Sequence, residues 1–181
     1  SIKSNYDYIS SKIDIESMTD WFILQAYSGN TDVTQNLKYV KLGNSGKWKW
    51  VAHDFDWSFY AHEYPFENVL IKGLWYTSYI IKPMLKNADY KQYFIERFAH
   101  HAKNTFNEPA NLISIIDELY AIIEPEITKE RARWGGTIES WKKHVNDIKS
   151  FVVDYNRCQE LIDSIISVFS LSQEDINKYF C

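Results

Sequence analysis

One strong turn sequence lies between two short runs that favour β-strand, in a chain whose other apolar patterns are helical. Gly43-Asn44-Ser45-Gly46 separates residues 36–42 from residues 47–55. Glycine and asparagine tolerate the positive φ angles that tight hairpin connections require. Polar and apolar side chains alternate from Lys47 to Val51, which predicts that one face of the hairpin is buried. The chain is therefore expected to contain one β-hairpin.

Apolar residues at helical spacing cover much of the remaining sequence. Asp14 is expected to cap a helix that runs to about Ser28, where Gly29 and Asn30 end it. All of the chain after about Tyr76 is predicted to be helical. The expected helix boundaries are Asp89, Pro109, Pro125, Gly135-Gly136 and a capping box of Ser172 and Asp175. The predicted fold class is α+β, mainly α, with one β-hairpin followed by a helical bundle.

Composition indicates a folded domain and excludes several partners. The chain has 181 residues, of which 45% are hydrophobic and 17% aromatic, enough for one domain with a sizeable core. The formal net charge is -4 and the basic residues are scattered, so neither nucleic acid nor an anionic membrane is an expected partner. No apolar run is long enough to span a membrane. Cys158 and Cys181 are expected to be free thiols.

Two acidic segments flank the predicted hairpin. Asp32 and Asn36 precede its first strand, and Asp54 and Asp56 end its second. Because a hairpin brings its ends together, the four side chains are expected to lie close to one another. In an extended run Asp54 and Asp56 would point to the same side, with Cα atoms about 6.5 Å apart, and Phe55 would face the core.

Oxygen ligands of this kind suit a hard divalent cation. Mg²⁺ takes one or two carboxylates from protein and completes its shell with water and substrate phosphates. Phosphoryl transfer uses such an ion together with one carboxylate that orients the attacking hydroxyl. Each motif also has a structural interpretation, since Asn30 and Asp32 after a helix could serve only as turn or capping residues. A pair of aspartates would also permit a glycosidase.

The motifs, taken in order, resemble the CotH family of spore coat protein H-like atypical protein kinases. The resemblance covers nearly the whole chain. Its components are residues 14–27, Gly29-Asn30-Thr31-Asp32 with Asn36, residues 46–50, the HDFDWSF run at 53–59, Arg97-Phe98, Glu124-Pro125-Glu126, Arg133-Trp134, Trp141 and residues 151–157.

The resemblance implies a role for each acidic residue. Asp32 would be the catalytic aspartate that orients the substrate hydroxyl. Asp54 and Asn36 would bind the metal–nucleotide complex, and Asp56 would support the metal directly or through water. The implied cofactor is Mg²⁺ or Mn²⁺, with ATP as substrate and Ser or Thr of a spore coat or surface protein as acceptor. The implied location is the spore coat or the extracellular cell surface.

Two departures from protein kinases matter. Three residues separate Asp32 from Asn36, one fewer than in ordinary protein kinases. No glycine-rich phosphate loop or strand lysine precedes Asp32, and too few residues lie ahead of it for an amino-terminal lobe. Residues 1–181 are therefore expected to be the carboxy-terminal lobe of a longer CotH-like kinase, inactive or weak in isolation.

Two further interpretations remain. A non-catalytic adhesion module of the same family would use exposed aromatics, for which Tyr60, Tyr64, Trp75 and Tyr76 are the candidates. Arg133 and Arg157 are expected to join helices by hydrogen bonds rather than to bind phosphate.

Overall fold

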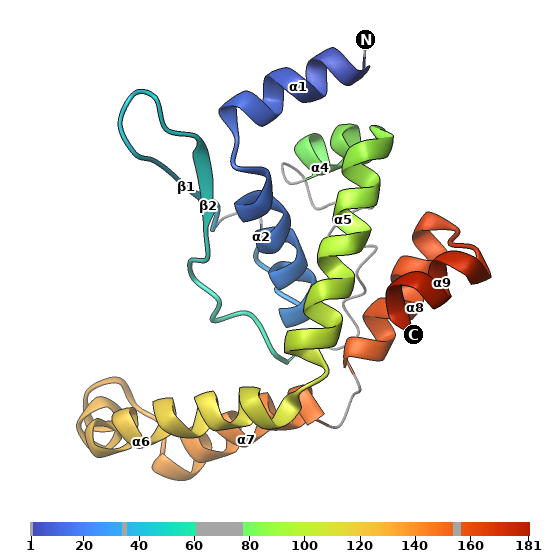
Figure 1. The fold of residues 1–181 in the computed structure, drawn as a ribbon. Coiled ribbons are helices and arrows are strands. Elements are labelled where there is room, and N and C mark those ends of the chain that lie inside the picture. The colour runs from blue at the N-terminus through green and yellow to red at the C-terminus, as the bar shows by residue number, and fades with distance from the viewer. Residues whose placement is uncertain (1, 34–35, 61–77, 154–156) are drawn as a thin grey trace.

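The computed structural model describes residues 2–33, 36–60, 78–153 and 157–181 (Figure 1). Most of the described chain is helical, and a small antiparallel hairpin supplies its sheet. The elements are α1 (Ile2–Lys12), α2 (Ile15–Ser28), β1 (Lys38–Lys41), β2 (Trp48–Val51), α4 (Ser78–Leu85), α5 (Ala88–His101), the π-helix η1 (Ala102–Phe106), α6 (Pro109–Trp134), α7 (Ile138–Val153), α8 (Arg157–Phe169) and α9 (Gln173–Phe180). The α+β, mainly α fold class is confirmed.

Helix α2 is the buried centre of the molecule. Asp14 caps its start by accepting a hydrogen bond from the Ser17 N–H at 3.0 Å, and Gly29 ends it in the left-handed region at φ 59°. Both boundaries were predicted correctly. The helix packs against α5, α8 and β2. Thr19 and Tyr90, both fully buried, are hydrogen bonded across the α2–α5 contact at 3.2 Å.

The core is largely aromatic and comes mainly from α2 and α5. Tyr90, Phe94 and Phe98 of α5 are fully buried, as their helical spacing predicted. Phe22 and Met18 of α2 face the same cluster, which leaves α2 little freedom to move. The end of α2, where the candidate site begins, is therefore attached to the buried core.

The hairpin pairs Lys38 with Val51 and Lys41 with Trp48, and its turn lies at residues 43–46 as predicted. Its strands are shorter than expected, and the prediction of a buried face is wrong. Trp48 is 46% exposed, and only Trp50 among the β2 residues is half-buried. The reason is that helix cover reaches the hairpin chiefly at Trp50, whose N–H donates to Ser17 Oγ at 3.0 Å.

Helices α6 and α7 lie side by side as a pair set away from the α2–α5 core (Figure 1). Pro125 was expected to start a helix, but α6 continues through it and loses one backbone donor there. Tyr120 of α6 stacks on Trp141 of α7 with ring centroids 4.8 Å apart. Gly135 ends α6, as predicted.

Other details separate prediction from structure. Helix α1 was not predicted, although Tyr6 and Ile9 share a helical face and pack on the core. The Ser172–Asp175 capping box is confirmed at the start of α9. Cys158 and Cys181 are both free. Across the parts of the chain described by the structure, no helix combines the length and apolar character of a membrane span.

Candidate functional site

The loop that carries Asp32 starts directly at the end of α2. The N–H groups of Gly29 and Asn30 donate to the carbonyls of Ala26 and Gln25, both at 3.3 Å, which closes the helix. Asn30 is fully buried, and its side-chain oxygen accepts a hydrogen bond from the Asp32 N–H at 2.9 Å. The buried Asn30 side chain thus holds the backbone of Asp32 two residues beyond the helix.

Asp32 and Asn36 are brought together by the fold. Asn36 Nδ2 donates to Asp32 Oδ2 at 3.1 Å, and both side chains are half-buried. One oxygen of the Asp32 carboxylate is therefore occupied by the amide. Asp32 Oδ1 and Asn36 Oδ1 remain as oxygens that this bond does not use.

Asp54 and Asp56 lie in the segment after β2, and both are exposed. The expectation of one extended run is wrong, because β2 ends at Val51 and Asp54 has a left-handed backbone with φ 57°. Aspartate is among the residues that tolerate this conformation best. Phe55 between them is half-buried and lines an apolar cavity of about 570 Å³.

Backbone hydrogen bonds join the two acidic segments. The Thr31 N–H donates to the Trp57 carbonyl at 3.2 Å, and the Phe59 N–H donates to the Ser28 carbonyl at 2.8 Å. Thr31 Oγ1 and the Tyr60 hydroxyl lie 2.6 Å apart. Residues 57–60 therefore run along the end of α2, and Asp32 and Asp56 each lie one residue from the same backbone hydrogen bond.

Comparison with protein families assigns the chain. The family model described as CotH kinase protein matches residues 1–158. This chain belongs to the CotH family. The match includes all four acidic-segment residues singled out in the sequence, together with α1 through α7. No curated protein and no solved structure matches the chain.

The oxygen atoms of the two acidic segments suit a hard cation in kind. Asp32, Asn36, Asp54 and Asp56 offer oxygen atoms, which are the ligands that Mg²⁺ and Mn²⁺ prefer. Within the described ranges, no three His, Cys, Asp or Glu side chains form a cluster able to hold a metal, so Asp32, Asp54 and Asp56 are not gathered as the sequence predicted. Mg²⁺ does not need such a cluster, because substrate phosphates and water normally supply much of its shell.

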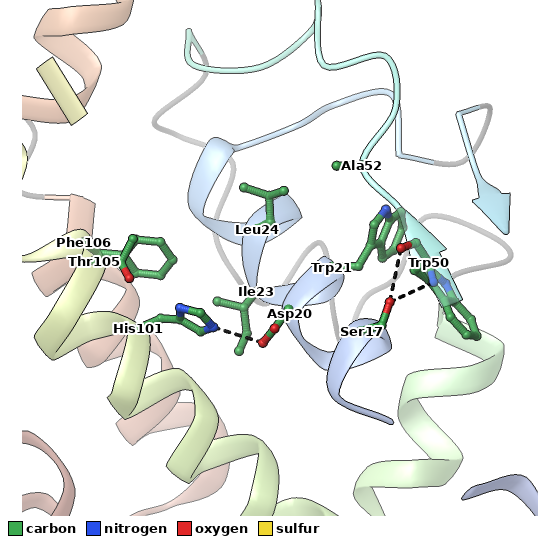
Figure 2. Close-up of a pocket in the computed structure, with 10 residues that line it drawn as sticks. All are labelled: Ser17, Asp20, Trp21, Ile23, Leu24, Trp50, Ala52, His101, Thr105 and Phe106. Atoms are coloured by element: carbon green, nitrogen blue, oxygen red, sulfur yellow. Dashed lines mark hydrogen bonds and ion pairs between the residues drawn. The ribbon is translucent and has the colours of Figure 1, made fainter. Parts of the chain in front are cut away.

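A second cavity, of about 390 Å³, lies between α2, β2 and the end of α5 (Figure 2). Asp20 faces His101 there, with His101 Nε2 at 3.0 Å from Asp20 Oδ1. Arg97 donates to both Asp20 oxygens at 2.6 Å. Burial opposes ionisation of Asp20, but the hydrogen bonds from Arg97 and His101 outweigh it and lower its pKa. This ionic cluster ties α2 to α5 and includes none of the four predicted residues.

Two further residues, Asn30 and Tyr60, are hydrogen bonded to the loop that carries Asp32. Asn30 forms the turn that the sequence predicted for it, because its buried side-chain oxygen accepts a hydrogen bond from the Asp32 N–H two residues on. Tyr60 was considered only for adhesion, yet it is hydrogen bonded beside Asp32 through Thr31. The signal for Asn30 was its place directly after the helix-ending glycine. Arg157 does join helices, as predicted, whereas Arg133 stacks on Trp134 of its own helix at 4.8 Å.

Proposed function

We propose that this CotH chain is the carboxy-terminal lobe of a protein kinase that transfers phosphate from ATP to Ser or Thr hydroxyls. Family membership supports a kinase-like activity. The observation that carries the proposal is the Asn36–Asp32 hydrogen bond beside the backbone-bonded segment that bears Asp54 and Asp56. Phosphoryl transfer uses one carboxylate that orients the attacking hydroxyl and further oxygen ligands that hold the metal, and the two acidic segments offer both.

Asp32 is the residue that orients the acceptor hydroxyl. Its Oδ2 is held by Asn36 and its N–H by Asn30, so its Oδ1 is the atom that accepts the hydrogen bond from the substrate hydroxyl. Fixing the carboxylate before substrate arrives lowers the entropic cost of reaching the reactive geometry. The same oxygen is placed to take the hydroxyl proton as phosphate transfers.

Asp54 and Asn36 would hold Mg²⁺ or Mn²⁺, with Asp56 in support directly or through water. A bound ion neutralises the charge of the β- and γ-phosphates of ATP. Asp54 suits this role because it is exposed and fixed in a left-handed backbone at the end of the β2 segment. Asn36 has its amide nitrogen occupied by Asp32, which leaves its carbonyl oxygen as the ligand.

A kinase binds its nucleotide between two lobes, and the amino-terminal lobe supplies the phosphate loop and the strand lysine. Residues 1–181 contain no glycine-rich phosphate loop and no strand lysine ahead of Asp32. We therefore assign those parts to an amino-terminal lobe of the parent protein, and expect the isolated chain to be inactive or weak. We propose a protein of the spore coat or of the extracellular cell surface as the acceptor, and the same location for the kinase.

Non-catalytic adhesion would be favoured by an aromatic row far from Asp54. Of the four aromatics considered for this role, Tyr64, Trp75 and Tyr76 lie outside the described residues. Tyr60 is 50% exposed but is bonded to Thr31, next to Asp32. Tyr60 therefore lies beside the acidic segments and gives no support for an aromatic row far from Asp54. The CotH assignment likewise disfavours a glycosidase.

Thermal unfolding with and without ATP and Mg²⁺ tests the metal assignment, on this chain and on the two-lobed parent. Ligand at about 100 times its dissociation constant stabilises by about 2.7 kcal/mol. Asp54→Asn is the matched variant, because asparagine also tolerates positive φ and only the charge is lost. The proposal predicts a metal-dependent rise in melting temperature that Asp54→Asn removes. An equal rise in the variant would overturn the role of Asp54.

A further inference from the structure

Arg157 is a buried cation placed at the end of α2. It is the first residue of α8 and is only 2% exposed. Its Nη2 donates to the Ala26 carbonyl at 2.7 Å, and its Nε donates to the Tyr27 carbonyl at 3.2 Å. Its Nη1 donates to Glu160 at 3.2 Å. One guanidinium from the far end of the chain therefore binds the last turn of α2.

The chemistry of a helix end explains this contact. The last carbonyls of a helix carry partial negative charge, which favours a cation. The Ala26 carbonyl also accepts a hydrogen bond from the Gly29 N–H, so Arg157 is its second donor. Burial of Arg157 opposes its charge and lowers its pKa, while Glu160 supports it from a partly exposed position. The arginine thus carries a desolvation cost, and its planar fork fixes two carbonyls in a defined geometry.

The same side chain is linked to the second acidic segment through Phe151. The Arg157 guanidinium lies over the Phe151 ring at 5.7 Å from its centroid. Phe151 in turn meets Phe59 edge to face, with centroids 5.7 Å apart. The Phe59 N–H donates to the Ser28 carbonyl, one residue beyond Tyr27. Arg157 therefore supports both the end of α2 and the segment that follows Asp54 and Asp56.

We propose that Arg157 is a positioning residue that acts through Asp32. It fixes the carbonyls of Ala26 and Tyr27, and with them the start of the loop in which Asn30 holds the Asp32 N–H. The consequence for catalysis rests on the kinase function proposed above. The effect on the Asp32 loop does not, so it can be tested without activity.

A residue that merely joined helices would act on stability alone, and Arg97 provides the comparison. Arg97 also binds α2 from another helix, through Asp20, but it does so in the middle of α2 rather than at its end. Arg157→Met and Arg97→Met each remove a guanidinium that binds α2. Only the first removes contacts to the last turn.

Hydrogen–deuterium exchange, read by mass spectrometry on peptides covering residues 29–33 and 57–60, tests the inference. Arg157→Met should speed exchange there by about tenfold relative to the rest of the chain, whereas Arg97→Met should not. Should Arg157→Met fail to fold, Arg157→Lys retains the charge and should show a smaller effect at the same peptides. Unchanged exchange at residues 29–33, or equal acceleration throughout the chain in both arginine variants, would overturn the proposal.

Discussion

The side-chain amide of Asn36 is hydrogen bonded to the Asp32 carboxylate at 3.1 Å, four residues back in the chain. This contact spans the short connection between α2 and β1 and occupies one of the two carboxylate oxygens. The two side chains thus meet although three residues separate them, one fewer than in ordinary protein kinases. The Asn30 side chain restrains the same aspartate from the other direction, through its N–H.

Replacing Asn30 tests whether Asp32 is held by a buried side chain. Asn30→Ala removes the acceptor of the Asp32 N–H and leaves a small void at a fully buried position. We expect a loss of about 1–3 kcal/mol in the free energy of unfolding, measured by urea denaturation. Asn44→Ala in the hairpin turn, where the side chain is exposed, is the control and should change stability little. Equal effects of the two substitutions would contradict the account.

Gly29 is expected to resist substitution because α2 ends there at φ 59°. A Cβ in the left-handed region costs about 1–2 kcal/mol, so Gly29→Ala should lower the free energy of unfolding by about that amount. Gly29→Asn should cost less, because asparagine tolerates this conformation better than alanine. Chemical denaturation of the two variants side by side checks the order. Alanine tolerated as well as asparagine would count against a left-handed Gly29.

The ionic cluster at Asp20 predicts a dependence of stability on acid. Its pKa is lowered from the ordinary value of 3.8, with burial opposing the hydrogen bonds from Arg97 and His101. Because the folded-state pKa is the lower one, Asp20 contributes stability above about pH 4, and this is lost as pH falls through the folded-state pKa. Asp20→Asn should therefore be less stable at neutral pH and show a shallower decline in acid.

Urea melts between pH 2 and about pH 7 measure that decline. The exposed Asp7 of α1 provides the control, since Asp7→Asn changes one surface carboxylate outside the cluster. If the free energy of unfolding of Asp20→Asn falls with acid as steeply as that of the unsubstituted chain, the Asp20 cluster does not cause the decline.

The two cysteines should differ in reactivity. Burial raises the pKa of the Cys158 thiol, whereas Cys181 at the chain end is exposed. Iodoacetamide should therefore modify Cys181 in the folded chain and both thiols only after denaturation. Mass spectrometry of the intact protein counts the additions. Rapid modification of Cys158 under native conditions would contradict its placement in the core.

Much of the fold was predictable because local chemistry determined it. Asp14, Gly29 and the Ser172–Asp175 pair set helix boundaries through hydrogen bonds and backbone preference that depend on few neighbours. Pro125 gave a wrong boundary, since a proline can be accommodated within a long helix that packing supports. The exposure of Trp48 depends on which surfaces the helices cover, and strand alternation alone does not contain that information.

The candidate site stays a prediction in its members, and its geometry could be predicted only in part from the sequence. The hairpin does bring residues 28–31 and 57–60 together through backbone hydrogen bonds, but among the described residues the expected gathering of Asp32, Asp54 and Asp56 into one cluster is not seen. The left-handed backbone of Asp54 was not predicted, because residues 47–55 were interpreted as one strand, whereas β2 ends at Val51. The contribution of Arg157 lies in contacts 130 residues apart in sequence, which no local pattern could show.

The central claim is tested most directly by transfer of radiolabelled γ-phosphate from ATP to a Ser- and Thr-containing acceptor protein, catalysed by a protein that joins this chain to the proposed amino-terminal lobe. Asp32→Asn, which keeps the shape of the side chain, should reduce the rate by about 100-fold or more while nucleotide binding persists. Transfer that continues at the original rate in Asp32→Asn would contradict the proposed role of this aspartate.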